Sequence, residues 1–379
     1  MIDRKPVLAL RRQMLQAEPV NISPWQRPSF PVRRIAIFRA LYLGDLLLAV
    51  PALRALRAGF PDAEITLIGL PWAASFARRF RHYIDRFVEF AGYPGIQEVA
   101  FIPEQTMRFL VEQRAYGYDL VIQMHGSGRT SDALAIALGG RVTVGYYDGE
   151  QPTGLTLGQP YPDDWPEVFR NLGLAYLLGC PNGYPALEFP LFAEDRHEAA
   201  ALLRALPRAD RPWIALHSGA RAPVRRWPTA YFAAVADTLA RRFDAQIILT
   251  GSNDELMTVQ EVQQRMTTRA MNVAGKTSLG GLAALISKLD LFITNDTGPA
   301  HIANAVDTPS ITLFGPVDPV RWASRDRVRH PILRQPVSCS PCTFRECPID
   351  HRCLRWITPD RVVAQAEALL LKGPVKCDA

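Results

Sequence analysis

The sequence predicts an α/β fold made of two similar domains that face each other across a cleft. Short apolar runs typical of buried strands alternate with helical stretches, which is the pattern of βαβ units and a parallel sheet. This alternation occurs twice, and the two series are joined near residues 181–211. Because 379 residues suffice for two or three domains, each series is expected to form one Rossmann-like domain.

The first series follows an N-terminal extension, residues 1–32, that is basic and punctuated by prolines. Apolar runs predict strands at residues 35–38, 65–70, 120–124 and 142–146. Helical periodicity predicts helices at residues 46–58, 72–80 and 167–178. Residues 33–195 are therefore assigned to the first domain.

The second series is assigned to residues 196–357. Strands are expected at residues 213–216, 247–249, 272–274, 291–293 and 311–314, and helices behind Thr229 and Ser278, from about residue 254, and at residues 300–306. Residues 358–379 are expected to form a crossover helix and a tail. Thr358 is a suitable N-cap, Pro359 fits the first turn, and Gly373 marks the stop.

Composition excludes a disordered chain, a coiled coil and a disulfide scaffold, since 48% of the residues are hydrophobic and 21% are charged. No apolar run approaches the ~18–20 residues of a spanning helix, and the apolar stretch at the N-terminus is too short for a signal peptide. We therefore expect a cytoplasmic protein.

The net charge is +6, and 38 of the 43 basic residues are arginines. Arginine suits carboxylates and phosphates, but such an excess is also typical of a GC-rich genome.

The loops that follow the strands are the expected ligand sites, because open α/β sheets bind ligands at the carboxyl ends of their strands. After the first strand, Gly44 allows a tight turn and Asp45 opens a helix. Asp45 is interpreted either as a helix cap or as a carboxylate that acts as a general base. The loop has no GxGxxG pattern, which disfavours a nicotinamide or flavin dinucleotide site.

Another loop, after the strand at residues 120–124, carries His125, Gly126, Gly128 and Arg129. Its glycines fit either the close approach of a phosphate or sugar, or a plain turn. Arg129 is suited to an anion.

In the second half, Ser218 and Gly219 follow the first strand, and such small residues let a ligand approach the backbone. Arg225 and Arg226 lie a few residues further on, where they suit a diphosphate. The alternative is a solvated loop with Trp227 packed beneath it.

The strongest signal is the segment at residues 295–301. A strand ends there in polar residues, Gly298 bends the chain, and a helix is expected to begin. The N–H groups at a helix N-terminus bind phosphate, and the hydroxyl of Thr297 and the ring of His301 add donors. Asp296 precedes this turn. The alternative for His301 is a core histidine.

Three motifs occur in order at matching points of the two halves: Gly44-Asp45 followed by Pro51, residues 225–228, and residues 295–301. In combination they resemble glycosyltransferase family 9, the ADP-heptose:lipopolysaccharide heptosyltransferases, over about residues 33–371. The resemblance implies the GT-B fold and an inverting, metal-independent transfer of heptose from ADP-heptose to a lipopolysaccharide inner-core acceptor. The sequence departs from the family at Arg225, where lysine is usual, and at Ser218-Gly219, where Pro-Gly is usual.

The resemblance also implies residue roles. Asp45 would be the catalytic base, and residues 33–195 would bind the acceptor, with His125 and Arg129 on the acceptor side. Residues 196–357 would bind the nucleotide sugar. The donor and its diphosphate would be held by Ser218, Gly219, Arg225, Asp296, Thr297, Gly298 and His301. The acceptor, a lipopolysaccharide precursor, would place the protein peripherally at the inner face of the inner membrane.

Alternative functions are a related family 9 transferase that uses another sugar or a protein (autotransporter) acceptor, and a non-catalytic nucleotide-binding scaffold. The presence of Asp45 together with residues 296–301 argues against the scaffold. No nucleic-acid partner is expected, because no helix-turn-helix or RNP-type motif occurs and the charge is spread along the chain.

Four of the six cysteines lie close together in the sequence: Cys339, Cys342, Cys347 and Cys353. Four thiolates at short spacing suit a tetrahedral structural zinc or iron, and some family members that modify autotransporters hold iron at a similar cluster. The spacing is not that of paired CxxC knuckles, so reduced structural cysteines are the alternative. Neither interpretation gives the metal a part in catalysis.

Overall fold

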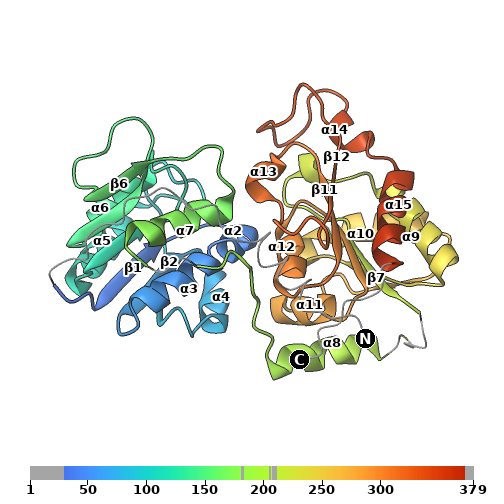
Figure 1. Cartoon of the computed structure of the whole chain (residues 1–379), viewed down its shortest axis with the longest axis horizontal. Helices are drawn as coiled ribbons and strands as arrows, with labels where there is room; N and C mark the ends of the chain where they lie inside the picture. Colours follow the sequence, from blue (N-terminus) through green and yellow to red (C-terminus); the bar gives the residue numbers. More distant parts are fainter. Residues whose placement is uncertain (1–29, 181–182, 205, 207–210, 372–379) are drawn as a thin grey trace, which may run out of the picture. The chain divides into compact units, whose positions relative to one another are not determined.

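The computed structural model describes residues 30–180, 183–204, 206 and 211–371. The chain divides into two compact units, Met1–Ala186 and Leu187–Ala379 (Figure 1). Of the expected N-terminal extension, only residues 30–32 lie within the described ranges, and residues 372–379 of the expected tail lie outside them. Across these ranges, no helix combines the length and the apolar character that crossing a membrane requires.

The first unit contains one six-stranded sheet in which every neighbouring pair of strands is parallel. Its strands are β1 (Arg34–Phe38), β2 (Glu64–Gly69), β3 (Arg86–Glu89), β4 (Leu120–Gln123), β5 (Val142–Tyr147) and β6 (Leu157–Pro160). Its helices are α2 (Leu43–Leu47), α3 (Val50–Gly59), α4 (Ala73–Arg79), α5 (Pro103–Tyr116), α6 (Ser131–Ala137) and α7 (Glu167–Leu177). The central strands β1 and β4 are almost wholly buried, as expected where helices cover both faces of a parallel sheet.

The strand order of this sheet, β3-β2-β1-β4-β5-β6, reverses direction between β1 and β4. At such a switch point the loops after the two adjacent strands diverge and leave a crevice, which is the usual ligand site of an open parallel sheet. The loops concerned carry Asp45 after β1 and His125 after β4.

The second unit repeats this plan. Its strands are β7 (Trp213–His217), β8 (Gln246–Thr250), β9 (Ala270–Asn272), β10 (Leu291–Asn295), β11 (Ser310–Phe314) and β12 (Ile332–Arg334). Its helices are α8 (Ala193–Leu203), α9 (Thr229–Phe243), α10 (Leu256–Arg265), α11 (Leu279–Ile286), α12 (Gly298–Ala305), α13 (Pro319–Trp322), α14 (Arg352–Arg355) and α15 (Pro359–Leu370), with 3₁₀ turns η1 (Pro223–Arg225) and η2 (Asn253–Glu255). The strand order β12-β11-β10-β7-β8-β9 places the switch point between β7 and β10.

The core of the second unit joins both ends of its sequence. Ile214 of β7, Leu239 of α9 and Val362 of α15 belong to one buried apolar cluster. The C-terminal helix therefore packs on the sheet of this unit. Its N-cap is Thr358, and Ser278 caps α11 by accepting a hydrogen bond from the Gly281 amide at 2.9 Å.

The predicted helix at residues 46–58 is wrong in its extent, since two helices, α2 and α3, occupy this segment. Pro51 lacks the N–H that would bond to the Leu47 carbonyl, so a continuous helix cannot form across it. Three edge strands, β3, β6 and β12, were not predicted. They are short and only half buried, so they lack the apolar run of the central strands.

Candidate active site

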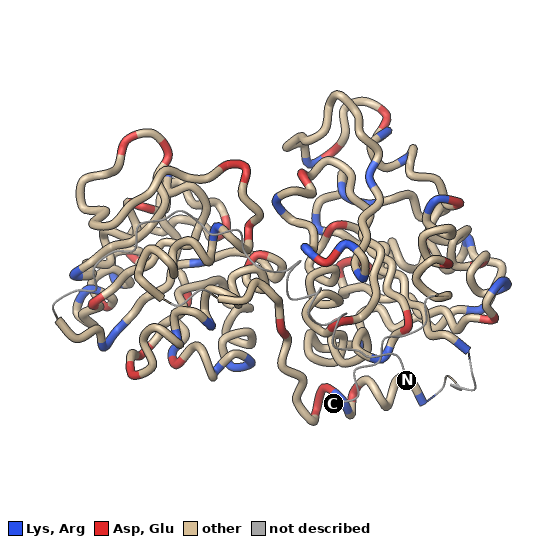
Figure 2. Tube along the Cα trace, in the orientation of Figure 1, with Lys and Arg blue, Asp and Glu red and all other residues tan. Residues whose placement is uncertain are grey.

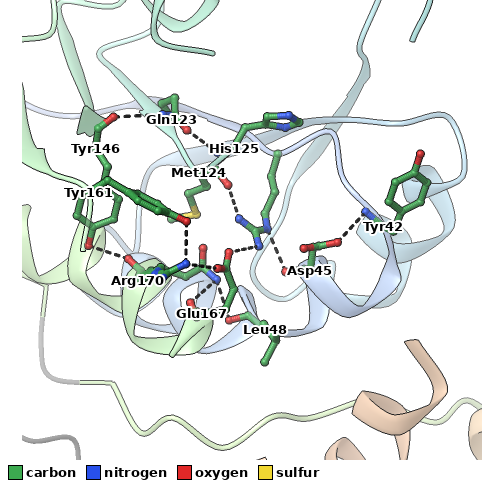
Figure 3. Close-up of polar contacts among 12 residues, drawn as sticks. Tyr42, Asp45, Leu48, Gln123, Met124, His125, Tyr146, Tyr161, Glu167 and Arg170 are labelled. Atoms are coloured by element: carbon green, nitrogen blue, oxygen red, sulfur yellow. Dashed lines mark hydrogen bonds and ion pairs between the residues drawn. The ribbon is translucent and has the colours of Figure 1, made fainter. Parts of the chain in front are cut away.

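Asp45 lies at the carboxyl end of β1, as the third residue of the short helix α2 (Figure 3). Its Oδ2 accepts a hydrogen bond from the Tyr42 amide at 3.3 Å, so the carboxylate caps the start of the helix. The residue is nevertheless half exposed. The helix-cap interpretation and a carboxylate accessible to a ligand are thus compatible at this position.

The backbone of Asp45 is held by a residue that we did not single out from the sequence. Arg39 follows β1 directly, is 1% exposed, and donates from Nε to the Asp45 carbonyl at 3.0 Å. In the sequence Arg39 is one arginine among 38. The sequence did offer one signal, namely that Arg39 directly follows a wholly apolar strand. A charged side chain is seldom buried at such a position unless it has a partner.

His125 lies at the carboxyl end of β4, beside the switch point. Its ring stacks on Phe38 of β1 with 5.0 Å between ring centroids, and its Nε2 is 3.7 Å from Oε2 of Glu98. Its Nδ1 is buried and has no hydrogen-bond partner within the described part of the chain. The ring is therefore held by stacking and keeps unused hydrogen-bonding capacity.

The glycines after His125 fit the turn interpretation. Gly128 has φ of +88°, and a Cβ there would come within 2.1 Å of the Tyr146 carbonyl oxygen, so only glycine fits. Arg129 is largely exposed and forms an ion pair with Asp148. A ligand anion would have to compete with that carboxylate for Arg129.

In the second unit, α12 begins directly after β10 and supplies a helix N-terminus at the switch point. Thr297 is the N-cap, and Gly298 and Pro299 form the first turn. Arg225, at the end of η1, places Nη1 3.3 Å from Oδ2 of Asp296. The Asp296 side chain is 5% exposed and that of Arg225 is 39% exposed. The guanidinium is thus anchored on a buried carboxylate and still accessible to an anion.

His301 projects from the same helix and is buried. Burial, assisted by the positive charge of Arg225, lowers the pKa of His301 to about 4. The imidazole is therefore neutral at pH 7, so it retains one N–H donor and one acceptor. Beside the helix N-terminus this neutral ring can donate a hydrogen bond to an anion.

The pKa of His301 predicts a pH dependence of stability. The unfolded chain has the ordinary histidine pKa of about 6.5, so below that pH the unfolded state binds a proton that the folded state excludes. The free energy of unfolding should therefore fall by about 2 kcal/mol between pH 7.5 and pH 5 through this residue. Urea unfolding at the two pH values measures the change in wild type and in His301→Gln, which should lose this contribution.

The exposed His197 on α8 provides the matched control. His197→Gln should keep the full wild-type dependence on pH. An equal dependence in His301→Gln and in wild type would contradict the assignment of a low pKa to His301.

Asn295, the last residue of β10, connects the loops around this site. Its Nδ2 donates to the carbonyls of Ser218 and Gly219 at 2.9 and 3.2 Å, and its Oδ1 accepts from the Trp227 amide at 3.0 Å. The side chain therefore ties the loop after β7 and the segment after η1 to the end of β10. Sequence reasoning did not assign Asn295 this role.

Gly219 lies against Glu255 of η2, another residue that was not predicted. A Cβ on Gly219 would come within 2.1 Å of the Glu255 carboxyl carbon, so the backbone passes directly beside this carboxylate. Oε2 of Glu255 is 3.5 Å from Nε2 of the buried His217. Burial lowers the pKa of His217 and outweighs the opposing effect of Glu255.

The structure thus gathers the predicted residues of the second unit, Ser218, Gly219, Arg225, Asp296, Thr297, Gly298 and His301, at the ends of β7 and β10. Asp45 and His125 lie at the ends of β1 and β4 in the first unit, whereas Arg129 is engaged with Asp148 further along its loop.

The four cysteines that were expected to hold a metal differ in their exposure. Cys339 is exposed, Cys353 is buried, and Cys342 and Cys347 are intermediate. Among the residues with a described placement, which include all four, no group of three or more His, Cys, Asp or Glu side chains is arranged to hold a metal ion. Burial, together with the neighbouring Cys347, Cys339 and Cys342, raises the pKa of Cys353 to about 11. The structure therefore does not support the structural zinc or iron.

Residues 107–352 match the family model of glycosyltransferase family 9 (heptosyltransferase). The chain belongs to glycosyltransferase family 9. The resemblance proposed from the three motifs is therefore confirmed, over a segment that contains η1 and the whole of residues 295–301.

Two family 9 relatives and one solved structure illustrate the match. Lipooligosaccharide heptosyltransferase 2 of Campylobacter jejuni is 28% identical over 38% of this chain and 47% of its own, so the chain spans about half the length of that relative. Lipopolysaccharide heptosyltransferase 3 of Escherichia coli K12 is 27% identical over 74% of this chain and 82% of its own. A family 9 glycosyl transferase from Veillonella parvula superposes with a TM-score of 0.76 at 24% identity, covering 92% of this chain and 100% of that one. This similarity confirms the predicted α/β fold of the GT-B class.

Proposed function

We propose that this family 9 chain is an inverting glycosyltransferase that moves a heptose from ADP-heptose to a lipopolysaccharide inner-core acceptor. The observation that carries the proposal is the pair of switch points. One presents the Asp45 carboxylate, and the other presents a helix N-terminus with an anchored arginine and a neutral histidine. A general base and a diphosphate site are the two parts that a single displacement at a nucleotide sugar requires.

In the proposed reaction, the Asp45 carboxylate accepts the proton of an acceptor hydroxyl. The acceptor oxygen forms a bond to the anomeric carbon while the bond from that carbon to the diphosphate oxygen breaks, and ADP leaves with the electron pair. Attack and departure occur on opposite faces of the carbon, so the configuration inverts. The base contributes about 10²–10⁴ to the rate, and stabilisation of the leaving charge contributes more.

The leaving diphosphate gathers negative charge, and the second unit supplies positive charge where α12 begins. These positive groups are fixed before the reaction. Asp296 holds the guanidinium of Arg225, and the helix itself holds the N–H groups of the first turn of α12. His301, being neutral, adds a hydrogen-bond donor. With these groups in place the proposed transfer needs no divalent cation.

The proposed acceptor carries a lipid anchor, so the reaction would take place at a membrane surface, peripherally at the cytoplasmic face of the inner membrane. Basic side chains would favour docking of a phosphorylated acceptor. Lys and Arg lie over both units, interspersed with acidic residues (Figure 2).

The test is incubation of the purified chain with ADP-heptose and heptose-deficient lipopolysaccharide in EDTA, followed by mass spectrometry of the acceptor. The acceptor should gain the mass of one heptosyl residue. A gain only with another sugar nucleotide, or only on an autotransporter protein, would assign a related family 9 activity. If no sugar nucleotide produces a gain, the chain is not a transferase.

A further inference from the structure

Arg39 is the most deeply buried cation beside the proposed catalytic base. Its three groups of donors reach three different elements: Nε bonds to the Asp45 carbonyl of α2, Nη1 to the Met124 carbonyl at the end of β4, and Nη2 to Oε1 of Glu167 on α7. The Nε and Nη2 contacts are both 3.0 Å. One side chain therefore connects the ends of both strands that form the switch point.

The contact with Asp45 compensates for the short length of α2. In a longer helix the Asp45 carbonyl would accept from the Ala49 amide, but this amide donates to Leu46, one residue later. The helix ends here because Pro51 follows. Arg39 bonds to the carbonyl of Asp45, so it holds the backbone of the residue that carries the carboxylate.

Glu167 keeps the Arg39 side chain in place and is itself held. Nη1 of Arg170 lies 3.4 Å from Oε2 of Glu167, and Arg170 also bonds to the Pro162 carbonyl and the Tyr161 hydroxyl. All three charged side chains are at least nine-tenths buried. These ion pairs are therefore part of the buried core, and the side chains cannot rearrange without leaving a buried charge unpaired.

Helix α7 holds the far end of α2 as well. Asn171, one turn after Glu167, donates from Nδ2 to the carbonyl of Leu48, the C-cap residue of α2, at 3.1 Å. Two side chains from different elements therefore bond to backbone carbonyls of this short segment: Arg39, which follows β1, at Asp45, and Asn171 of α7 at the C-cap Leu48.

We propose that Arg39, held by Glu167, is a positioning residue that fixes the Asp45 carboxylate relative to the end of β4. The inference rests on the proposed function, because it assigns Asp45 the role of base. Burial alone requires acceptors for a guanidinium, so positioning is inferred from which acceptors Arg39 uses: the backbone of Asp45 and the end of β4. Displacing a catalytic group by about 1 Å costs about 10²-fold in rate, so loss of this contact should act on turnover.

The test measures kcat and the KM for both substrates in Arg39→Met and Arg39→Lys. Arg39→Met should lower kcat by about 10–100-fold while the donor KM stays within about threefold, because the proposed donor residues belong to the other unit. Arg39→Lys keeps the charge but can bond to at most part of the set, so it should lower kcat by about 5–30-fold. Arg39→Lys carries the test if Arg39→Met does not fold.

Arg57 is the matched control for stability. It lies in the same unit, pairs with Asp85, and donates to the carbonyls of Ala63 and Tyr83 at 2.7 and 3.2 Å. Arg57→Met should lower the melting temperature and leave kcat within about twofold. Equal loss of kcat in the Arg57 and Arg39 variants at equal loss of melting temperature would overturn the proposal.

A double-mutant cycle gives the readout that a purely structural role would not move. If Arg39 acts through Asp45, Arg39→Met should cost less than about threefold in kcat when Asp45 is already asparagine. The same fold-loss in both backgrounds would overturn the positioning role. Wild-type transfer with fully active Arg39 variants would overturn this inference alone, whereas a wild type that transfers no sugar would overturn the proposed function and the inference with it.

Discussion

Asp45→Asn is expected to lower kcat by about 10²–10⁴-fold and to leave donor affinity within a few-fold. Asparagine keeps the shape and the oxygen that accepts from the Tyr42 amide, so α2 should stay capped. It removes the group that accepts the proton of the acceptor hydroxyl. Initial rates of heptosyl transfer and calorimetric titration with ADP measure the two quantities.

Asp62, an exposed aspartate in the turn after α3, provides the matched control for Asp45. Asp62→Asn makes the same chemical change in the same unit and should leave kcat within about twofold. Near-normal turnover in Asp45→Asn would contradict the role of the carboxylate as base. An equal loss of ADP affinity and of kcat would assign Asp45 to binding.

Arg225→Ala is expected to lower kcat/KM by about 10²–10³-fold, because it removes the cation that faces the leaving diphosphate. It also leaves the buried Asp296 carboxylate without this partner, and the negative charge then repels the donor. Arg225→Lys should restore most of the rate, since a point charge is kept and only the fork geometry is lost. Steady-state kinetics with varied donor measure both variants.

Arg265 on α10 is the control for Arg225, because it also pairs with a carboxylate, that of Glu261, but on an exposed helix face. Arg265→Ala should leave kcat/KM within about twofold. If Arg225→Ala retains more than half of the wild-type kcat/KM, the leaving group is stabilised elsewhere.

The central part of each sheet could be predicted from the sequence, because buried parallel strands are uninterrupted apolar runs. Residues 35–38 and 311–314 lie within β1 and β11 as expected. Three of the four edge strands, β3, β6 and β12, could not be predicted in this way. β6 contains Gly158 and Pro160 and is half buried, so no apolar period marks it.

In the candidate site, too, some residues could be predicted from the sequence and others could not. Asp45, Ser218 and Thr297 were proposed because they lie in the loops that follow predicted strands, where a parallel sheet places its ligands. Arg39 and Glu167 are 128 residues apart, and Asn295 contacts residues at separations of 68 to 77. Such pairs are brought together only by the fold, so local patterns do not show which residues are partners.

The metal site expected at the cysteine cluster has no support from the structure. Four thiols within fifteen residues suggested a metal site, but ligation depends on where each side chain points. In this loop one thiol is exposed and another is buried in the core of the second unit, and the described residues include no group arranged to hold a metal ion.

The anomeric configuration of the newly attached heptose tests the central claim most directly. Asp45 as base and a diphosphate leaving from the opposite face together require a single displacement. Nuclear magnetic resonance of the isolated product, compared with the ADP-heptose donor, should therefore show the inverted configuration at the anomeric carbon. A product that retains the donor configuration would contradict the account.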